Sequence, residues 1–207
     1  GAEVVSETVE YLNRVKGMKT GVVKVRLYRP FPAAELRKVL PPTVRIVAAL
    51  DRTKEFGAEH EPLCMDVVSA LAGTGVKVVG GRYGLSSKEF DPSMVKAVFD
   101  ELGSPSPRPT FTVAITDDVT GLSLPVVDHI DTSAASGTYQ SVFYAIGNDG
   151  TVGGTKQVAT IFGNYSGLYA QAYFNYSAKK SGGYTISQLR VGKSPVTSAY
   201  SIESADY

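Results

Sequence analysis

Hydrophobic residues recur at two different spacings along the first 128 residues of the chain. Segments in which they return every three to four residues, as on one face of an α-helix, alternate with short valine-rich runs typical of buried strands. The helical spacing predicts helices at residues 6–17, 32–40, 62–73 and 92–103. The valine-rich runs predict strands at residues 21–28, 43–50, 76–81 and, at a sheet edge, 111–115. This alternation favours a three-layer α/β fold, in which helices cover both faces of a parallel sheet.

The last third of the chain follows a different pattern. Strands are predicted at residues 141–147, 168–178 and 184–192, and a glycine-rich turn followed by a helix separates the first two. A break rich in proline and serine at residues 103–110 and a polar, turn-rich stretch at residues 129–140 precede this change. We therefore predict one α/β domain at residues 1–128, a linker at 129–140, and part of a second α/β domain at 141–207.

Composition excludes several classes of protein. The chain has 207 residues, 43% of them apolar, and a formal net charge of +1 without a basic stripe, which argues against a nucleic-acid partner. No apolar run approaches the roughly 20 residues of a membrane span, and the N-terminus has no signal-peptide pattern. Cys64 is the single cysteine, so we expect neither an internal disulfide nor a cysteine-ligated metal. We expect a cytoplasmic protein, or an organellar one in a eukaryote, with no membrane partner.

The two ends of the chain lack the features of natural termini. The first residue is Gly1, and the helical spacing of Val5, Val9 and Leu12 begins almost at once, without a strand that leads into it. The last residues stop without a helix cap or a polar tail. We therefore expect an internal piece of a longer polypeptide, in which the first domain lacks its first strand and the second is truncated.

The glycine-rich turn "GNDGTVGGTK" at residues 147–156 is the first candidate binding element. Glycines at this density permit positive φ angles and a close approach of a ligand to the backbone. Amides at the start of the following helix attract anions, which makes a strand, a glycine turn and a helix a common setting for phosphate. Neither the dinucleotide fingerprint nor the P-loop pattern is satisfied, however. A tight structural turn, with Asn148 or Asp149 capping the helix, fits the sequence equally well.

A second candidate is the basic stretch "SAKKSGG" at residues 177–183. Lys179 and Lys180 stand at the end of a predicted strand, beside another glycine turn. This turn could lie at the same edge of the sheet as residues 147–151, which would favour a shared anion site. The alternative is a pair of solvated lysines at a strand end.

Other chemically suggestive residues have structural interpretations. Asp51 and Arg52 follow a strand at its carboxyl end, where α/β folds often bind ligands, but an interdomain salt bridge explains them better. His60 fits no metal-ligand spacing, so we interpret it as part of a charged loop. Cys64 lies in an apolar helical run and is expected in the core. The remaining interpretations are turn capping for two aspartates and packing on half-buried strands for four tyrosines: Asp117, Asp118, Tyr165, Tyr169, Tyr173 and Tyr176.

Six segments of the chain resemble consecutive stretches of the pyruvate:ferredoxin oxidoreductase family. They are "VKVRLYRPFP", "LDRTKEFGAEHEPLCMDVV", "GGRYGLSSKEFDPSMVKAVFDEL", "FTVAITDDVTGLSLPV", "IGNDGTVGGTK" and "YSAKKSGGYTISQLRVGKSPVTSAY". The resemblance covers essentially the whole chain in order. It implies the end of a transketolase C-terminal-like domain, followed by the start of a γ-type domain.

The resemblance implies an enzyme that converts pyruvate and coenzyme A to acetyl-CoA and carbon dioxide. In that family thiamine diphosphate with Mg²⁺ carries the carbanion, [4Fe-4S] clusters pass electrons to ferredoxin or flavodoxin, and the enzyme is a homodimer. This chain has neither the cluster cysteines nor the thiamine-binding domains. We therefore predict no catalytic residue and no metal site in it, and expect the piece alone to be inactive.

The resemblance also implies coenzyme A contacts in this chain. The family's "GSDGT" loop and the lysine of its "SKKSG" stretch correspond to Gly147, Asn148, Asp149, Gly150, Thr151 and Lys179. Asn148 stands where the family usually has Ser, and Gly154-Thr155 replaces Ala-Asn. Backbone amides and an ammonium group suit the phosphates of coenzyme A. The alternative is a non-catalytic α/β binding or scaffold module without a ligand.

Overall fold

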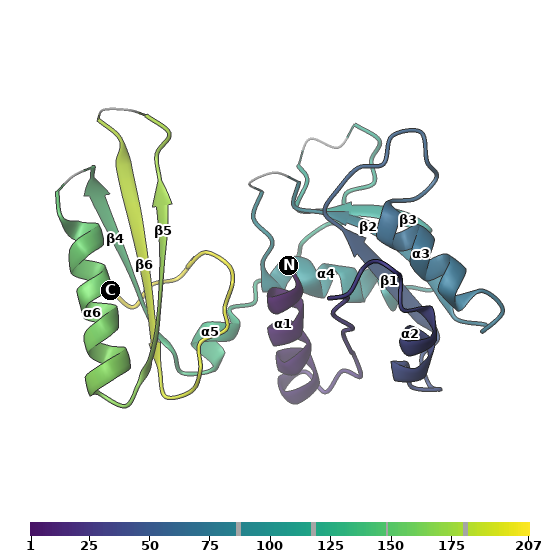
Figure 1. Ribbon diagram of the computed structural model, residues 1–207, viewed down its shortest axis with the longest axis horizontal. Helices are drawn as coiled ribbons and strands as arrows, with labels where there is room; N and C mark the ends of the chain where they lie inside the picture. The colour runs from purple at the N-terminus through teal and green to yellow at the C-terminus, as the bar shows by residue number, and fades with distance from the viewer. Residues whose placement is uncertain (86–87, 117–118, 148, 180–181) are drawn as a thin grey trace. The chain divides into compact units, whose positions relative to one another are not determined.

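The computed structural model describes residues 1–85, 88–116, 119–147, 149–179 and 182–207. The chain divides into two compact units, Gly1–His129 and Ile130–Tyr207. Figure 1 shows the elements of each unit, and each is considered by itself.

The first unit is built on a three-stranded parallel sheet with the order β1-β2-β3. Its elements in chain order are α1 Ala2–Val15, α2 Ala33–Val39, β1 Ile46–Asp51, α3 Pro62–Leu71, β2 Lys77–Tyr83, α4 Pro92–Leu102 and β3 Thr110–Val113. The predicted α/β fold is confirmed, as are the four helices and the edge position of β3. Connections between parallel strands require such crossover helices.

The strand predicted at residues 21–28 is wrong, because this segment pairs with no strand of the described chain. Val22, Val23 and Leu27 are exposed to solvent. Valine-rich runs fit a pleated, half-buried surface, and β-propensity alone does not form a strand without a neighbouring strand and a face to bury.

Helices cover both faces of the parallel sheet (Figure 1). On one face α3 packs on β1 and β2, and α2 packs on α3; the core there consists of Leu36, Ala49, Cys64, Val67, Ala70 and Leu71. On the other face α4 packs on the sheet and α1 packs on α4. Gly81 points to this other face of the sheet. A Cβ there would stand 2.5 Å from Leu50 Cδ2 and 2.6 Å from Phe111 Cε2, so only glycine fits without repacking.

The second unit contains a three-stranded antiparallel sheet with the order β4-β6-β5. Its elements are α5 Thr132–Ala135, β4 Tyr139–Ile146, α6 Thr151–Tyr165, β5 Tyr169–Tyr176 and β6 Tyr184–Gly192. Helix α6 packs on β5 and β6 (Figure 1). The three predicted strands and the helix after the glycine turn are confirmed.

The interpretation of the four tyrosines as half-buried strand residues is wrong. Tyr165 is the last residue of α6 and is 81% exposed, while Tyr169, Tyr173 and Tyr176 of β5 are 48 to 64% exposed. The reason is that β5 is an edge strand of this sheet, so its tyrosine side chains have less surface to pack against than those of a central strand.

Candidate functional site

Two loops meet at one end of the antiparallel sheet. In the register of β4 and β6, Ile146 at the end of β4 lies opposite Tyr184 at the start of β6. Beyond this pair, the Gly147 amide donates a 2.8 Å hydrogen bond to the Gly183 carbonyl. The glycine turn after β4 and the basic turn between β5 and β6 are therefore neighbours (Figure 1), as the sequence analysis considered.

The glycine turn is held in a fixed conformation at the start of α6. Gly150 precedes the helix with φ +90°, a left-handed conformation that favours glycine. The Asp149 Oδ1 accepts a 2.9 Å hydrogen bond from the Thr151 amide. This backbone hydrogen bond lowers the pKa of the Asp149 carboxyl, so the carboxylate is satisfied locally. The predicted helix cap by Asp149 is wrong, because the N-cap residue of α6 is Gly150, which has no side-chain cap hydrogen bond, and Asp149 only closes a local turn before it. Asn148 lies outside the described residues.

Lys179 lies in the neighbouring turn with an exposed side chain. Its amide donates to Ser177 Oγ at 3.3 Å, and a Cβ at Gly183 would stand 3.1 Å from the Lys179 carbonyl, so glycine allows the turn to close tightly. Lys180 lies outside the described residues. Lys156, which also follows the glycine turn in sequence, points its ammonium over the Phe174 ring at 5.5 Å. Among the described residues, Lys179 is therefore the lysine of this turn with an exposed side chain.

The arrangement has the chemistry of a site for a phosphate group. Within α6 the Gly154 amide donates to the Gly150 carbonyl, and Thr151 donates to Asp149. Helix geometry leaves the amides of Val152 and Gly153 without acceptors inside the helix. These two donors and the Lys179 ammonium could hold a phosphate, although the Asp149 carboxylate partly offsets their positive potential.

The conformation of Gly150 gives a stability prediction. We expect Gly150→Val to destabilise the second unit by about 2 kcal/mol, because a β-branched residue is strained at positive φ. Gly153→Ala is the matched control within the same helix, since a Cβ there meets nothing within 4 Å. This control should stabilise the helix by about 0.5–1 kcal/mol, and urea unfolding monitored by circular dichroism would measure both changes. Equal effects of the two substitutions would contradict the left-handed turn.

Asp51 and Arg52, at the end of β1, form hydrogen bonds that stabilise the fold of the first unit. Asp51 accepts hydrogen bonds from the Leu63 and Cys64 amides at 2.9 and 3.1 Å and so caps α3. Arg52 Nε donates to the Gly84 carbonyl at 2.7 Å, within the same unit, and the interdomain salt bridge stays a prediction. Cys64 is fully buried, and burial raises the pKa of its thiol to about 11, which confirms its assignment to the core.

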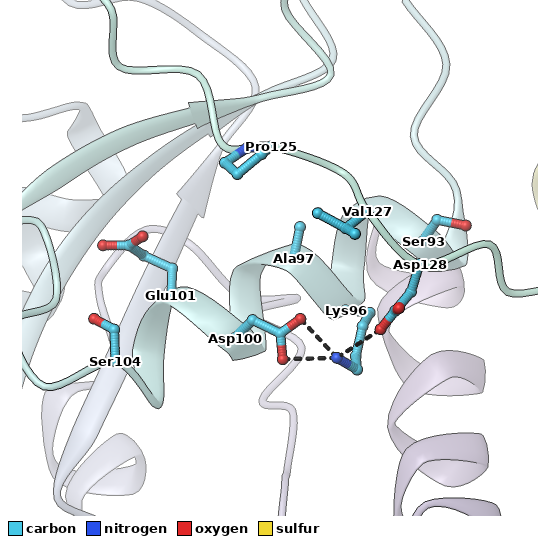
Figure 2. Close-up of a pocket in the computed structure, with 9 residues that line it drawn as sticks. All are labelled: Ser93, Lys96, Ala97, Asp100, Glu101, Ser104, Pro125, Val127 and Asp128. Carbon is cyan, nitrogen blue, oxygen red and sulfur yellow. Dashed lines mark hydrogen bonds and ion pairs between the residues drawn. The ribbon is translucent and has the colours of Figure 1, made fainter.

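Figure 2 shows a cavity of about 220 Å³ beside α4. Lys96 Nζ lies in it, 2.6 Å from Asp100 Oδ2 and 3.0 Å from Asp128 Oδ2. The hydrogen bond to Asp100 raises the pKa of Lys96. Because two carboxylates already neutralise this ammonium, we interpret the cluster as a contact between α4 and the segment that ends the first unit.

A second cavity, of about 290 Å³, lies over β2 and the start of β3. Glu61 and Arg82 form a 2.9 Å ion pair in its wall, and Lys54 Nζ lies 3.5 Å from the same carboxylate. Burial alone would raise the pKa of Glu61, but hydrogen bonds from the Glu55 amide and Arg82 lower it overall. His60 stood out in the sequence, but this ion pair did not, because its members lie 21 positions apart.

The described part of the chain has neither a metal-ligand cluster nor a membrane-spanning helix. Among those residues, no group of three His, Cys, Asp or Glu side chains could hold a metal ion. Likewise, no described helix has the length and apolar character required to span a membrane. The interpretation of Asp117 and Asp118 as turn caps concerns positions outside the described residues.

Comparison with known proteins identifies the family. Residues 2–95 match the family described as pyruvate:ferredoxin oxidoreductase core domain II, and residues 140–207 match the family described as pyruvate ferredoxin/flavodoxin oxidoreductase. The chain belongs to the pyruvate:ferredoxin/flavodoxin oxidoreductase family, which confirms the resemblance seen in the sequence.

The relatives are similar over the whole chain but are much longer. The chain is 56% identical over 206 residues to the pyruvate:ferredoxin oxidoreductase of Moorella thermoacetica, covering 99% of this chain and 17% of the relative. It is 51% identical over 213 residues to the probable pyruvate-flavodoxin oxidoreductase of Escherichia coli, covering 99% and 18%. It is also 48% identical over 211 residues to a mitochondrial pyruvate dehydrogenase [NADP(+)] of Euglena gracilis, covering 100% and 12%.

Proposed function

We propose that this chain is a segment of a pyruvate:ferredoxin or pyruvate:flavodoxin oxidoreductase. The reaction is oxidative decarboxylation of pyruvate with coenzyme A, which yields acetyl-CoA and carbon dioxide and passes electrons to ferredoxin or flavodoxin. The observation that carries the proposal is 56% identity over 99% of the chain to an enzyme of that name. The complete enzyme is proposed to be a homodimer located in the cytoplasm or, in a eukaryote, in an organelle.

Within that enzyme the chain has a structural part and a binding part. We propose that residues 1–128 form the end of a transketolase C-terminal-like domain, 129–140 a linker, and 141–207 the start of a γ-type domain. The first part contributes packing surfaces, and the second contributes coenzyme A contacts from Gly147 to Thr151 and from Lys179. The contact between Gly147 and Gly183 supports this proposal, because it holds the two loops side by side.

The other cofactors of the family do not fit the residues present here. An iron–sulfur cluster requires several thiolates, and the chain has one cysteine, which is fully buried. Among the described residues, no group of three or more His, Cys, Asp or Glu side chains could hold a metal ion. Thiamine diphosphate, Mg²⁺ and the [4Fe-4S] clusters therefore belong to other parts of the proposed enzyme, and no catalytic step is assigned to this chain.

The chain's own contribution is to bind and hold coenzyme A. A diphosphate needs several donors, and backbone amides supply them without the loss of side-chain entropy. The Lys179 ammonium adds a positive charge that a flexible side chain can direct at either phosphate group.

The test is an assay of the complete protein that carries this chain. We expect anaerobic reduction of ferredoxin or flavodoxin that requires both pyruvate and coenzyme A, with acetyl-CoA formed in equal amount to the carbon dioxide released. Reduction that proceeds equally without pyruvate would contradict the proposed reaction. A complete protein with no activity and no affinity for coenzyme A would favour the alternative of a scaffold module.

A further inference from the structure

The last residues of the chain, whose end is marked in Figure 1, lie along the outer edge of β4 in the second unit. In the order β4-β6-β5, β4 is an edge strand of the sheet. The Tyr207 amide donates to the Gln140 carbonyl at 3.3 Å, and the Val142 amide donates to the Tyr207 carbonyl at 3.0 Å. Two hydrogen bonds from one residue to both neighbours of the residue that it faces are the pattern of parallel pairing, so Tyr207 pairs with Ser141 as a parallel strand does.

Further hydrogen bonds fix the register of this contact. Gln140 Nε2 donates to the Ser204 carbonyl at 3.1 Å, and the Gln140 amide donates to Asp206 Oδ2 at 2.8 Å. The Asp206 amide in turn donates to the Gln140 carbonyl at 2.8 Å. Gln140 is 2% exposed, so these bonds form in a place from which water is excluded and are stronger for it. The direction and register of the chain at Tyr207 therefore already match those of a strand beside β4.

Beyond Val142, no strand among the described residues pairs with the outer edge of β4. Backbone groups alternate between the two sides of a strand, so Tyr144 and Ile146 turn their amides to the same edge as Val142. The amides of Phe143 and Ala145 turn to β6 instead. Tyr144 is 79% exposed and Ile146 is 73% exposed. Proteins rarely leave an apolar strand edge of this kind open, because it pairs with other chains.

We propose that the polypeptide that follows Tyr207 in the complete enzyme forms a fourth strand of this sheet, parallel to β4. The inference rests on the proposed function, in which the chain is a segment of a longer enzyme, as the 17% and 18% coverage of its relatives indicates. In the register of Tyr207, about four further residues reach the level of Ile146, and the second and fourth of them bond to the open edge. A segment that is already held in register has a high effective concentration, which favours it over a second copy of the chain.

The added strand ends beside the proposed coenzyme A loops. It runs parallel to β4, so its carboxyl end lies level with Ile146, directly before the glycine turn at residues 147–151. The basic turn that contains Lys179 adjoins the glycine turn on the β6 side, through the contact of Gly147 with Gly183. The residues that follow the added strand adjoin the glycine turn on its other side. They therefore form a third segment of the proposed coenzyme A site.

Amide hydrogen exchange in the complete enzyme tests the added strand. It is measured without coenzyme A, by mass spectrometry that resolves single amides, so the result does not depend on the coenzyme A proposal. The amides of Phe143 and Ala145 face β6 in either case and are the internal reference. We expect Tyr144 and Ile146 to exchange within about tenfold of this reference rate, because their amides are then paired as well. Exchange of Tyr144 and Ile146 that is faster than this would overturn the proposal.

Two proline variants of the complete enzyme identify the segment that covers the edge. Proline at the second residue after Tyr207 removes an amide that donates to the Val142 carbonyl, whereas proline at the third residue removes an amide that points away from β4. We expect Tyr144 to exchange at least about tenfold faster in the first variant than in the second. Equal exchange of Tyr144 in the two variants, whether fast or slow, would overturn the assignment to this segment.

Coenzyme A itself tests the position of the residues after the added strand. We expect saturating coenzyme A to slow the exchange of their amides in the complete enzyme, together with those of residues 149–151. An enzyme that binds coenzyme A without slowing the amides after the added strand would contradict their place in the site and leave the proposed function intact. An enzyme that does not bind coenzyme A would contradict the proposed function, and the exchange of Tyr144 and Ile146 would still decide whether the added strand exists.

Discussion

Replacing Lys179 by alanine in the complete enzyme should weaken coenzyme A binding by roughly ten- to a hundredfold. A hydrogen bond to a charged group contributes about 1.5–3 kcal/mol, which corresponds to this range of affinity. The Lys179 side chain is exposed, so its removal should leave the fold intact. Pyruvate binding and decarboxylation should hardly change, because no residue of this chain is assigned to those steps. The measurement is a coenzyme A titration at saturating pyruvate and at two salt concentrations.

Lys193→Ala is the matched control for Lys179→Ala. Lys193 is also exposed, but it follows the last residue of β6, at the other end of the sheet. Nine residues of strand separate the two ends by about 30 Å, at 3.3 Å per residue. Equal, small losses of coenzyme A affinity in the two variants would mean that the basic turn is a solvated strand end without a binding role. A loss confined to Lys179→Ala would support the coenzyme A site.

The sequence predicted those elements whose signals are local. Helix α4 begins where a buried Asp91 side chain accepts from the Met94 amide and Pro92 follows, and both residues are recognisable start signals. The segment at 21–28 carried an equally clear strand signal. It failed because pairing is not a local property: the signal says that a strand would be favourable, not that a partner is present.

The candidate sites were predictable to different degrees for the same reason. The glycine turn and the basic turn are each visible in the sequence, but their position at the same end of the sheet was one possibility that the sequence left open. The sequence offered Asp149 as a helix cap, but the N-cap residue is Gly150, and the Asp149 carboxylate accepts from the Thr151 amide in the turn before the helix. The ion pair of Glu61 and Arg82 left no pattern at all, because it depends on how α3 lies over β2.

Asp51→Ala should destabilise the first unit by about 2–4 kcal/mol, although the sequence placed this residue among candidate ligand contacts. The carboxylate is 6% exposed and accepts from two backbone amides, Leu63 and Cys64. Removing it leaves both donors unpaired at the buried start of α3, which costs more than the loss of an exposed helix cap. Guanidinium unfolding of wild type and variant gives the difference. Asp91→Ala is the control, because Asp91 is equally buried but accepts from one amide, that of Met94. This substitution should lower the free energy of unfolding by about 1 kcal/mol.

Comparing wild type with Asp51→Asn separates the effect of the hydrogen bonds on stability from the effect of the Asp51 charge. The quantity compared is the stability of each protein as a function of pH. Burial raises the pKa of Asp51 above its ordinary value, and the hydrogen bonds from Leu63 and Cys64 only partly oppose this. A carboxyl with a raised pKa in the folded state favours folding when protonated, and this contribution is lost as the pH rises through the folded pKa. The asparagine side chain of Asp51→Asn does not titrate. The stability of wild type relative to this variant should therefore increase as the pH falls from 7 to 4.5. A relative stability that instead falls on acidification would mean that the two amides stabilise the carboxylate more than burial disfavours it.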